Sequence, residues 1–299
     1  MLHYEVMKHP DNHKDPKEWI MLLHGLGGST SIWYKQIPEL KKHYNLILPD
    51  FYGHGNSNKK TLPVYTFQGL ADAVVKVLDD LEIDRVHLMG ISMGSSLGCF
   101  IAVYQPHRIK SMILGGAALG MDTRTTILLH AGNILKYVMP YMWIYGFFAW
   151  IMMPRKNHAK SRAIFVREAR KLGGKEFRKW YRLLMKFPLY QLELESPTLM
   201  EIPKLFISGS QDHLFLKQVV DWSGRDPNAV LHIIEGQGHL CNIEWPEEFN
   251  QACINYIDGR VWEKKQTPNG PGHEHGSPGD KTRVDAEEID AAEKRRATA

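Results

Sequence analysis

The chain has 299 residues, of which 43% are hydrophobic and 23% are charged, as in ordinary soluble globular proteins. Its 37 basic and 33 acidic residues leave a formal charge of only +4, which argues against a nucleic-acid-binding protein, because such proteins need a dense basic surface. The first residues lead into a charged segment and not into an apolar stretch, so no secretory signal is expected and the expected location is cytoplasmic. The three cysteines form no CxxC pair and are expected to be buried and reduced.

Short apolar runs alternate with longer helical patterns along most of the chain. Six runs rich in Val, Ile and Leu are typical of buried strands: Trp19–Leu23, Leu46–Leu48, Val86–Met89, Met112–Leu114, Leu205–Ile207 and Val230–Ile234. Helical patterns lie between and after them: Phe67–Leu81, Met93–Tyr104, Leu216–Trp222 and Pro246–Tyr256. This alternation predicts the α/β class, with a mostly parallel central sheet covered by helices on both faces.

The alternation stops between about Leu119 and Pro197, where only helical patterns occur. Such an insertion is expected to cover the carboxyl ends of the strands, where open α/β sheets place their ligands. We therefore expect a first core segment over residues 1–118, an all-helical cap over 119–198 and a second core segment over 199–262. Apolar periodicity is lost over 263–299, which predicts a disordered or weakly helical tail; an engineered extension is the alternative.

The strongest local motif is Gly90-Ile91-Ser92-Met93-Gly94, between a predicted strand and a predicted helix. A sharp strand-to-helix turn needs small neighbours at both glycine positions and lifts the serine hydroxyl out of the sheet. A G-x-S-x-G match alone is weak evidence, because an ordinary glycine turn has the same letters. Its position after a strand makes Ser92 the expected nucleophile.

A serine hydroxyl needs a base to take its proton as it attacks. His239 follows the last predicted strand, so it is expected at the same end of the sheet as Ser92. Asp212 follows strand Leu205–Ile207 and is expected to orient the imidazole and to stabilise its cation. Ser, Asp, His is one of the chain orders in which such catalytic triads occur. Asp122, after the preceding strand, is the remaining rival for the acid.

Hydrolysis also requires donors for the oxyanion of the tetrahedral intermediate. The turn His24-Gly25-Leu26-Gly27-Gly28 ends a strand and leaves backbone N–H groups available. We assign the donors to the backbone N–H of Leu26 and of Met93, and expect His24 to be structural. As a phosphate loop, this turn lacks the required glycine spacing, lysine and helix start.

Taken together, these motifs resemble the α/β-hydrolase superfamily over roughly residues 1–258. Asp50-Phe51-Tyr52-Gly53-His54-Gly55-Asn56-Ser57 is similar to the family's D-x-x-G-x-G-x-S turn, and His239 followed by Glu244-Trp245-Pro246 resembles its histidine loop. In this superfamily the G-x-S-x-G turn is called the nucleophile elbow. A serine, and not an aspartate, at this elbow points away from haloalkane dehalogenases and epoxide hydrolases. No cofactor is expected, and no metal site, because neither His9 with His13 nor His273 with His275 has the further ligands that zinc needs.

The predicted cap holds two contrasting segments. Residues 137–153 carry no charge and are rich in aromatics and methionine, which predicts a cap helix buried against the core. Part of the segment, including Tyr137, Trp143, Phe147 and Trp150, could also line an acyl pocket, and the two interpretations are compatible. Residues 155–186 carry twelve Lys or Arg against Glu168 and Glu176. That run is either a solvated helix face, a weak contact with an anionic membrane surface, or a region that attracts anionic substrates.

The resemblance implies a serine hydrolase that cleaves carboxylic esters of a fairly hydrophobic acyl group through an acyl-enzyme. Lactones, such as acyl-homoserine lactones, and thioesters are alternative small-molecule substrates of the same chemistry. A second class of function is a small-molecule sensor that keeps the triad but acts by binding a ligand and then a partner protein. Multiple turnover on several esters would favour the enzyme, and slow single turnover would favour the sensor.

Overall fold

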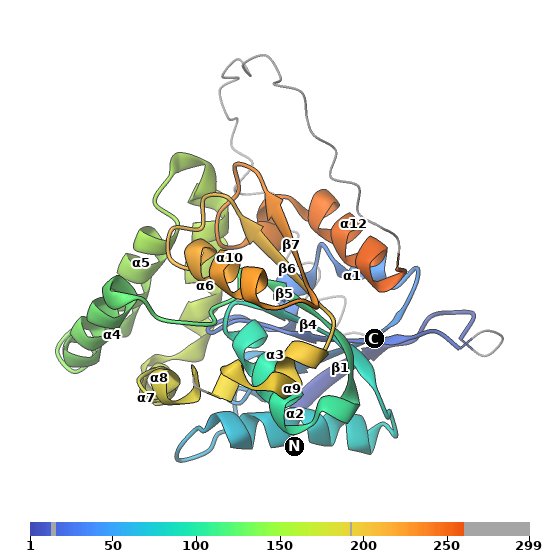
Figure 1. The fold of residues 1–299 in the computed structure, drawn as a ribbon. Helices are drawn as coiled ribbons and strands as arrows, with labels where there is room; N and C mark the ends of the chain where they lie inside the picture. Colours follow the sequence, from blue (N-terminus) through green and yellow to red (C-terminus); the bar gives the residue numbers. More distant parts are fainter. Residues whose placement is uncertain (13–15, 192, 260–299) are drawn as a thin grey trace.

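A computed structural model describes residues 1–12, 16–191 and 193–259; the tail expected over 263–299 lies outside this part of the chain. Seven strands form a single sheet in the order β1-β3-β2-β4-β5-β6-β7 (Figure 1). The strands are β1 (His3–Met7), β2 (Trp19–Leu23), β3 (Asn45–Asp50), β4 (Val86–Ile91), β5 (Ile109–Gly115), β6 (Lys204–Gly209) and β7 (Ala229–Ile234). Each of the six expected strands is present.

The sheet is parallel except at one edge, where β1 runs antiparallel to β3. Strand β1 was not predicted from the sequence, because its side chains are all half-buried and show no alternation. In the interior, the parallel register aligns the strand ends: Ile91 of β4 lies opposite Gly115 of β5, and Gly115 lies opposite Ile207 of β6. Loops that leave β4, β5 and β6 therefore start side by side.

Two hydrophobic cores cover the two faces of the sheet, as the alternation of strand side chains requires. On β2, Met21 and Leu23 point into one core, and Ile20 and Leu22 point into the other. The first core takes helices α2 (Phe67–Asp80), α3 (Met93–Tyr104) and α10 (Leu216–Arg225). The second takes α1 (Ile37–Leu40), α11 (Cys241–Glu244) and α12 (Pro246–Ile257), so α2 and α12 lie on opposite sides of the sheet (Figure 1). Short 3₁₀ turns occur at Thr30–Trp33, Gly55–Ser57 and Pro106–Arg108.

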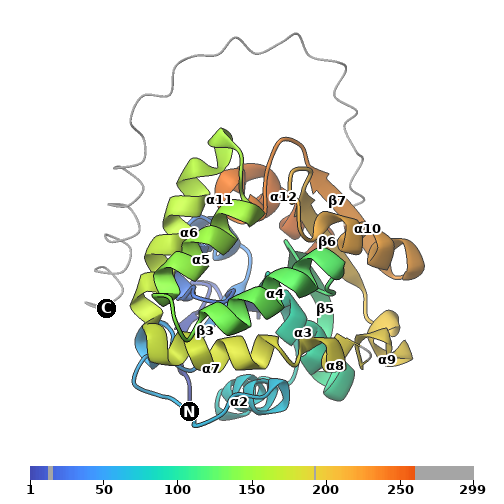
Figure 2. The ribbon, with the colours of Figure 1, turned by 90° about the vertical axis from the view of Figure 1, so that its left-hand side faces the viewer.

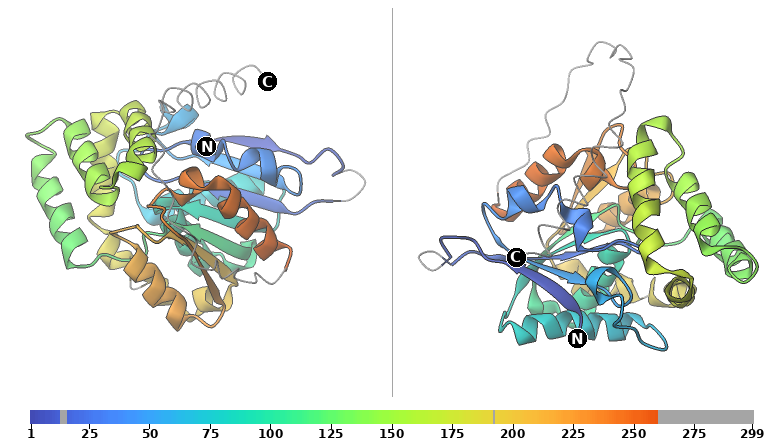
Figure 3. Two further views of the ribbon diagram at one scale, coloured as in Figure 1. Left: turned by 90° about the horizontal axis from the view of Figure 1, so that it is seen from above. Right: turned by 180° about the vertical axis from the view of Figure 1, so that it is seen from behind.

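A helical insertion separates β5 from β6. It consists of α4 (Thr123–Leu135), α5 (Tyr141–Met152), a 3₁₀ turn at Lys156–His158, α6 (Ala159–Leu172), α7 (Gly174–Leu184), α8 (Phe187–Gln191), a 3₁₀ turn at Glu193–Glu195 and α9 (Pro197–Glu201). Helices α4 to α7 gather to one side of the sheet, and α9 returns to pack on α3 (Figures 2 and 3). No helix within the described ranges has the length and apolar character needed to cross a bilayer.

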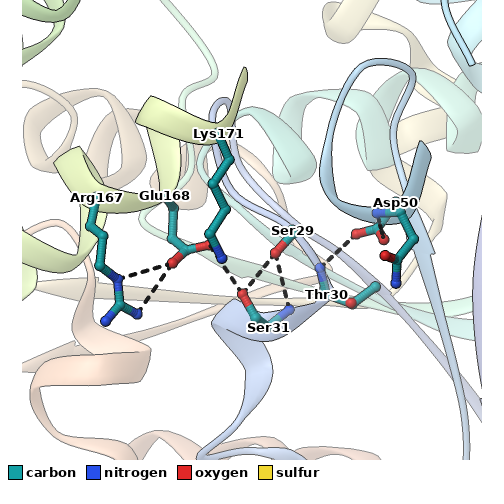
Figure 4. Close-up of polar contacts among 8 residues, drawn as sticks. Ser29, Thr30, Ser31, Asp50, Arg167, Glu168 and Lys171 are labelled. Atoms are coloured by element: carbon teal, nitrogen blue, oxygen red, sulfur yellow. Dashed lines mark hydrogen bonds and ion pairs between the residues drawn. The ribbon is translucent and has the colours of Figure 1, made fainter. Parts of the chain in front are cut away.

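Polar contacts fasten the insertion to the core at the loop after β2 (Figure 4). The Ser31 hydroxyl donates to the Glu168 carboxylate of α6 at 3.3 Å. Glu168 is almost fully buried and also pairs with Arg167 at 3.2 Å and with Lys171 at 3.1 Å. On the same loop, the N–H of Thr30 donates to the Asp50 carboxylate at 2.8 Å. The insertion is therefore held against the segment that also contains Leu26.

Candidate active site

Ser92 stands on a strained turn between β4 and α3. Its backbone has φ 54° and ψ −120°, a conformation that costs on the order of 1–3 kcal/mol for a residue with a side chain. The turn is possible because its neighbours are glycine. A Cβ on Gly90 would lie 2.6 Å from the backbone of Gly94, and a Cβ on Gly94 would lie 2.1 Å from the carbonyl oxygen of Leu23.

The structure brings Ser92, His239 and Asp212 into one hydrogen-bonded chain. His239 Nε2 lies 2.9 Å from Ser92 Oγ, and His239 Nδ1 lies 2.8 Å from Asp212 Oδ2. The second carboxylate oxygen, Asp212 Oδ1, accepts the backbone N–H of Leu214 and of Phe215 at 3.3 and 3.2 Å. Both the His239 and the Asp212 side chains are fully buried, so the imidazole is held between fixed partners.

Asp122, the rival for the acid, has another role in the structure. It is the N-cap residue of α4, and its carboxylate accepts the N–H of Thr125 at 2.7 Å. That hydrogen bond is the main reason that the pKa of Asp122 is lowered. The position after β5 therefore supplies a helix cap, and the partner of His239 follows β6.

The histidine loop is fastened on both sides by contacts that the sequence did not reveal. The N–H of Gln211 donates to the Gln237 carbonyl at 2.8 Å, which ties the acid loop to the histidine loop. The Glu244 carboxylate accepts the N–H of Gly238 and the hydroxyl of Ser161, a residue of α6. Glu244 stands five residues after His239, in the Glu-Trp-Pro segment that resembles the family's histidine loop. The sequence indicates that position, but it does not show that the carboxylate accepts these two hydrogen bonds.

Leu26 and Met93 lie beside Ser92, where they line the same cavity. Among the hydrogen bonds of the described residues, neither the N–H of Leu26 nor that of Met93 has a protein acceptor. Tyr145 of α5 donates its hydroxyl to the Leu26 carbonyl at 2.7 Å, and the N–H of Gly27 donates to His54 Nε2 at 2.9 Å. These two bonds fix the peptide group that joins Leu26 to Gly27 and leave the N–H of Leu26 available.

His24 and His54 support this loop as neutral side chains. His24 Nε2 accepts the N–H of Phe51 at 3.0 Å, and the Nδ1 side faces the Gly25 carbonyl at 2.8 Å. Burial lowers the pKa of His54 to about 3, and burial also lowers the pKa of His24. Both rings accept a backbone N–H, which a protonated imidazole cannot do. His24 thus has the environment of a structural residue, and His54, from the Asp50–Ser57 turn, supports the same loop.

A cavity of about 210 Å³ runs from Ser92 into the helical insertion. Trp143 and Phe147, two of the four aromatics expected to line a pocket, line it; Tyr137 and Trp150 lie outside it. Tyr137, in the turn before α5, and Trp150, near the end of α5, are mostly exposed to solvent. The cavity is lined instead by further apolar residues from several helices, including Leu128, Met139, Phe148, Ile151, Phe165, Phe177, Leu184 and Phe215.

No described residue lining this cavity is charged. Its two tyrosine hydroxyls are already engaged, that of Tyr145 with the Leu26 carbonyl and that of Tyr181 with the Leu129 carbonyl at 2.7 Å. Beyond Ser92, the surface offered to a ligand is therefore dominated by aliphatic and aromatic groups. Within the described ranges, no three His, Cys, Asp or Glu side chains converge as a metal site would require.

Comparison with known proteins agrees with this architecture. A model of the alpha/beta hydrolase fold family matches residues 18–142. RutD of Caulobacter vibrioides, provisionally named as a carbamate hydrolase, is 28% identical over 279 residues, which cover 86% of this chain and 96% of RutD. An enol-lactonase from Burkholderia xenovorans LB400 superimposes with a TM-score of 0.71 at 22% identity, over 86% of this chain and 96% of that one.

A carboxylesterase of the thaumarchaeon Nitrososphaera gargenis superimposes with a TM-score of 0.70 at 19% identity, over 86% of this chain and 94% of that one. The likeness to both solved structures establishes the common fold. The family match and these likenesses show that the chain has the α/β-hydrolase fold and that its sequence is similar to those of hydrolases with this fold.

Proposed function

We propose that the protein is a serine hydrolase that cleaves carboxylic esters with an apolar acyl group. The observation that supports this most directly is the hydrogen-bonded chain from Ser92 Oγ through His239 to Asp212, at the mouth of an uncharged cavity. Solved enzymes of the same fold include a carboxylesterase and an enol-lactonase. An ester bond, open or in a lactone ring, is therefore the substrate class that we assign.

In the proposed reaction, Ser92 Oγ attacks the carbonyl carbon of the ester while His239 Nε2 takes its proton. Negative charge develops on the carbonyl oxygen, which is stabilised by the N–H groups of Leu26 and Met93. His239 then gives the proton to the departing alcohol, and an acyl ester on Ser92 remains. Water attacks that ester with His239 again as base, which releases the acid and restores the hydroxyl.

Each buried partner has a consequence for this cycle. The Asp212 carboxylate accepts a hydrogen bond from the N–H at His239 Nδ1, which leaves Nε2 free to accept from Ser92. The Tyr145 hydroxyl holds the Leu26 carbonyl away from the oxyanion position, so that the Leu26 N–H and not its oxygen faces the substrate. We propose the helical insertion over 119–198 as the cap that shapes the acyl site, with 1–118 and 199–262 as the core.

The test is a series of p-nitrophenyl esters of increasing acyl length, with Ser92→Ala as the blank. Each methylene that enters the cavity contributes about 0.8 kcal/mol, so kcat/KM is expected to rise about fourfold per carbon until the cavity is filled. Ser92→Ala should lose turnover and labelling by a fluorophosphonate, yet keep the wild-type midpoint of urea unfolding. Normal labelling of Ser92→Ala would refute the assignment of the nucleophile. Acylation that stops after one turnover in the wild type would instead indicate the ligand sensor.

A further inference from the structure

Helix α5 exposes a stripe of large aromatic side chains. Trp143, Phe147 and Trp150 recur at the spacing of one helix face, and they are 68%, 58% and 55% exposed. The opposite face of α5 is buried, including Tyr145 and Ala149. The turn between α4 and α5 and the end of α4 add exposed residues of the same kind. We call the set the apolar face: Ile134, Tyr137, Val138, Trp143, Phe147 and Trp150.

This face is continuous with the substrate cavity. Trp143 and Phe147 belong both to the apolar face and to the lining of the cavity, and Leu135 of α4 joins them there. The cavity therefore opens between α4 and α5, the two helices turned toward the viewer in Figure 2. Exposed apolar clusters of this kind mark contacts with a membrane, a protein or a ligand. Here two members of the cluster, Trp143 and Phe147, also line the cavity that leads to Ser92.

Cations border the apolar face along α7. Lys175, Arg178 and Arg182 are exposed, line one open cleft with Thr61–Pro63, and form no ion pair among the described residues. A Cβ on Gly174 would lie 3.2 Å from Tyr141, the first residue of α5, and 3.7 Å from the Arg178 guanidinium. Arg178 is thus near the start of α5.

Lys136 connects α7 to the apolar face from the other side. Its ammonium lies 5.1 Å from the ring centre of Tyr137 and 5.1 Å from that of Tyr181, and it is close enough to Arg182 for the two charges to repel. Lys179, by contrast, pairs with Glu176 at 2.8 Å and is largely covered. The exposed cations that α7 places next to the aromatic stripe are therefore Lys175, Arg178 and Arg182. Lys179 is not among them, because it is paired and covered.

We propose that the apolar face and the bordering cations of α7 dock the protein on an anionic lipid bilayer. Aromatic and aliphatic side chains enter the interface, and the three α7 cations meet the lipid phosphates, a combination typical of interfacial helices. The cavity entrance then faces the acyl chains, so a lipophilic ester reaches Ser92 without crossing water. That last step rests on the proposed function, whereas docking does not.

Docking is tested in the Ser92→Ala background, so that hydrolysis cannot alter the lipid. Sedimentation with phosphatidylglycerol vesicles gives the partition constant, with phosphatidylcholine vesicles for comparison. Each basic residue at an anionic surface contributes about fivefold, so reversing Lys175, Arg178 and Arg182 to glutamate should weaken binding at least about 100-fold. The matched control reverses three exposed lysines of the core by the same net charge: Lys8, Lys41 and Lys217.

The control variant should bind much more tightly than the α7 variant, and binding of the wild type should weaken as salt shortens the Debye length from about 10 Å at 0.1 M to about 3 Å at 1 M. The pair Val138→Ser and Trp150→Ser, neither of which lines the cavity, should lower vesicle binding about tenfold. With Ser92 restored, the α7 variant and the Val138→Ser, Trp150→Ser variant should both hydrolyse a short soluble ester at the wild-type rate. Failure of that turnover in every form would overturn the proposed function alone.

Equal binding of the α7 and core variants, or no vesicle binding by the wild type, would overturn docking. Analytical ultracentrifugation addresses the other occupant of the apolar face, a second copy of the chain. A wild-type dimer that Val138→Ser and Trp150→Ser dissociate, without vesicle binding, would also overturn the proposal. A shift of tryptophan fluorescence to shorter wavelength on phosphatidylglycerol vesicles, reduced in Trp150→Ser because Trp143 remains, would support it.

Discussion

Replacing Asp212 by asparagine changes which nitrogen of His239 carries its proton, and therefore whether Nε2 can accept the proton of Ser92. The asparagine oxygen can serve only one of two partners: His239 Nδ1, which lies at 2.8 Å, or the N–H groups of Leu214 and Phe215 at 3.3 and 3.2 Å. If it accepts the two backbone N–H groups, its NH₂ faces His239. The imidazole must then carry its proton on Nε2, where it cannot accept from the serine.

The alternative rotamer is costly. It would place the NH₂ against two buried N–H donors, at about 1–3 kcal/mol for each unsatisfied group. With about 3 kcal/mol in total, fewer than about one molecule in 100 holds the productive tautomer. Loss of the carboxylate charge beside the imidazolium removes about 1.5–3 kcal/mol more. The two effects together predict a fall in kcat of about 10³–10⁴-fold.

The assay is the turnover of p-nitrophenyl butyrate together with the rate of fluorophosphonate labelling. Asp122→Asn is the matched control, because Asp122 caps α4 and asparagine caps a helix about as well as aspartate. That control should keep activity within a few-fold of the wild type. A loss below about tenfold for Asp212→Asn, or an equal loss for Asp122→Asn, would refute this account of the acid.

Two further predictions concern the fold around the site. Gly94→Ala, whose Cβ would lie 2.1 Å from the Leu23 carbonyl oxygen, should cost about 3 kcal/mol of unfolding free energy or prevent folding. Gly146→Ala in α5, with nothing within 4 Å, should gain about 0.5–1 kcal/mol; equal effects of the two variants in urea unfolding would contradict the elbow geometry. Because burial lowers the pKa of His54 to about 3, its ring takes up a proton only on unfolding as pH falls below about 6.5. The contribution of His54 to stability should therefore be fully present well above pH 6.5 and decrease by about 1.4 kcal/mol between pH 7.5 and 5.5. A urea midpoint that does not fall over this interval would contradict it.

Much of the fold was predictable because the central strands are buried on both faces. Such strands must be continuous apolar runs, and β2 and β4 are almost entirely buried, so their boundaries follow from composition. Strand β1 is half-buried along its whole length and acquires its conformation from pairing with β3. An edge strand of this kind has no sequence pattern of its own.

The candidate triad was predictable for a different reason. Parallel strands end at one edge of the sheet, so Ser92, Asp212 and His239 could be expected near one another from their places after strands alone. The pocket could not be predicted in the same way. Whether Trp143 or Trp150 of α5 faces the cavity depends on how the insertion docks, and that docking rests on long-range contacts such as Ser31 with Glu168.

The contacts at the start of α6 have a consequence for how such an enzyme can change. Asn157 donates its side-chain amide to the Gly236 carbonyl at 2.9 Å, and Ser161 donates to the Glu244 carboxylate that also holds the Gly238 N–H. Helix α6, which lines the cavity through Phe165, is therefore hydrogen-bonded at its start to the loop that positions His239. On the proposed function, a change in the insertion that admits a bulkier acyl group is therefore expected to move His239 as well, so that substrate range and turnover rate change together unless contacts around Glu244 also change.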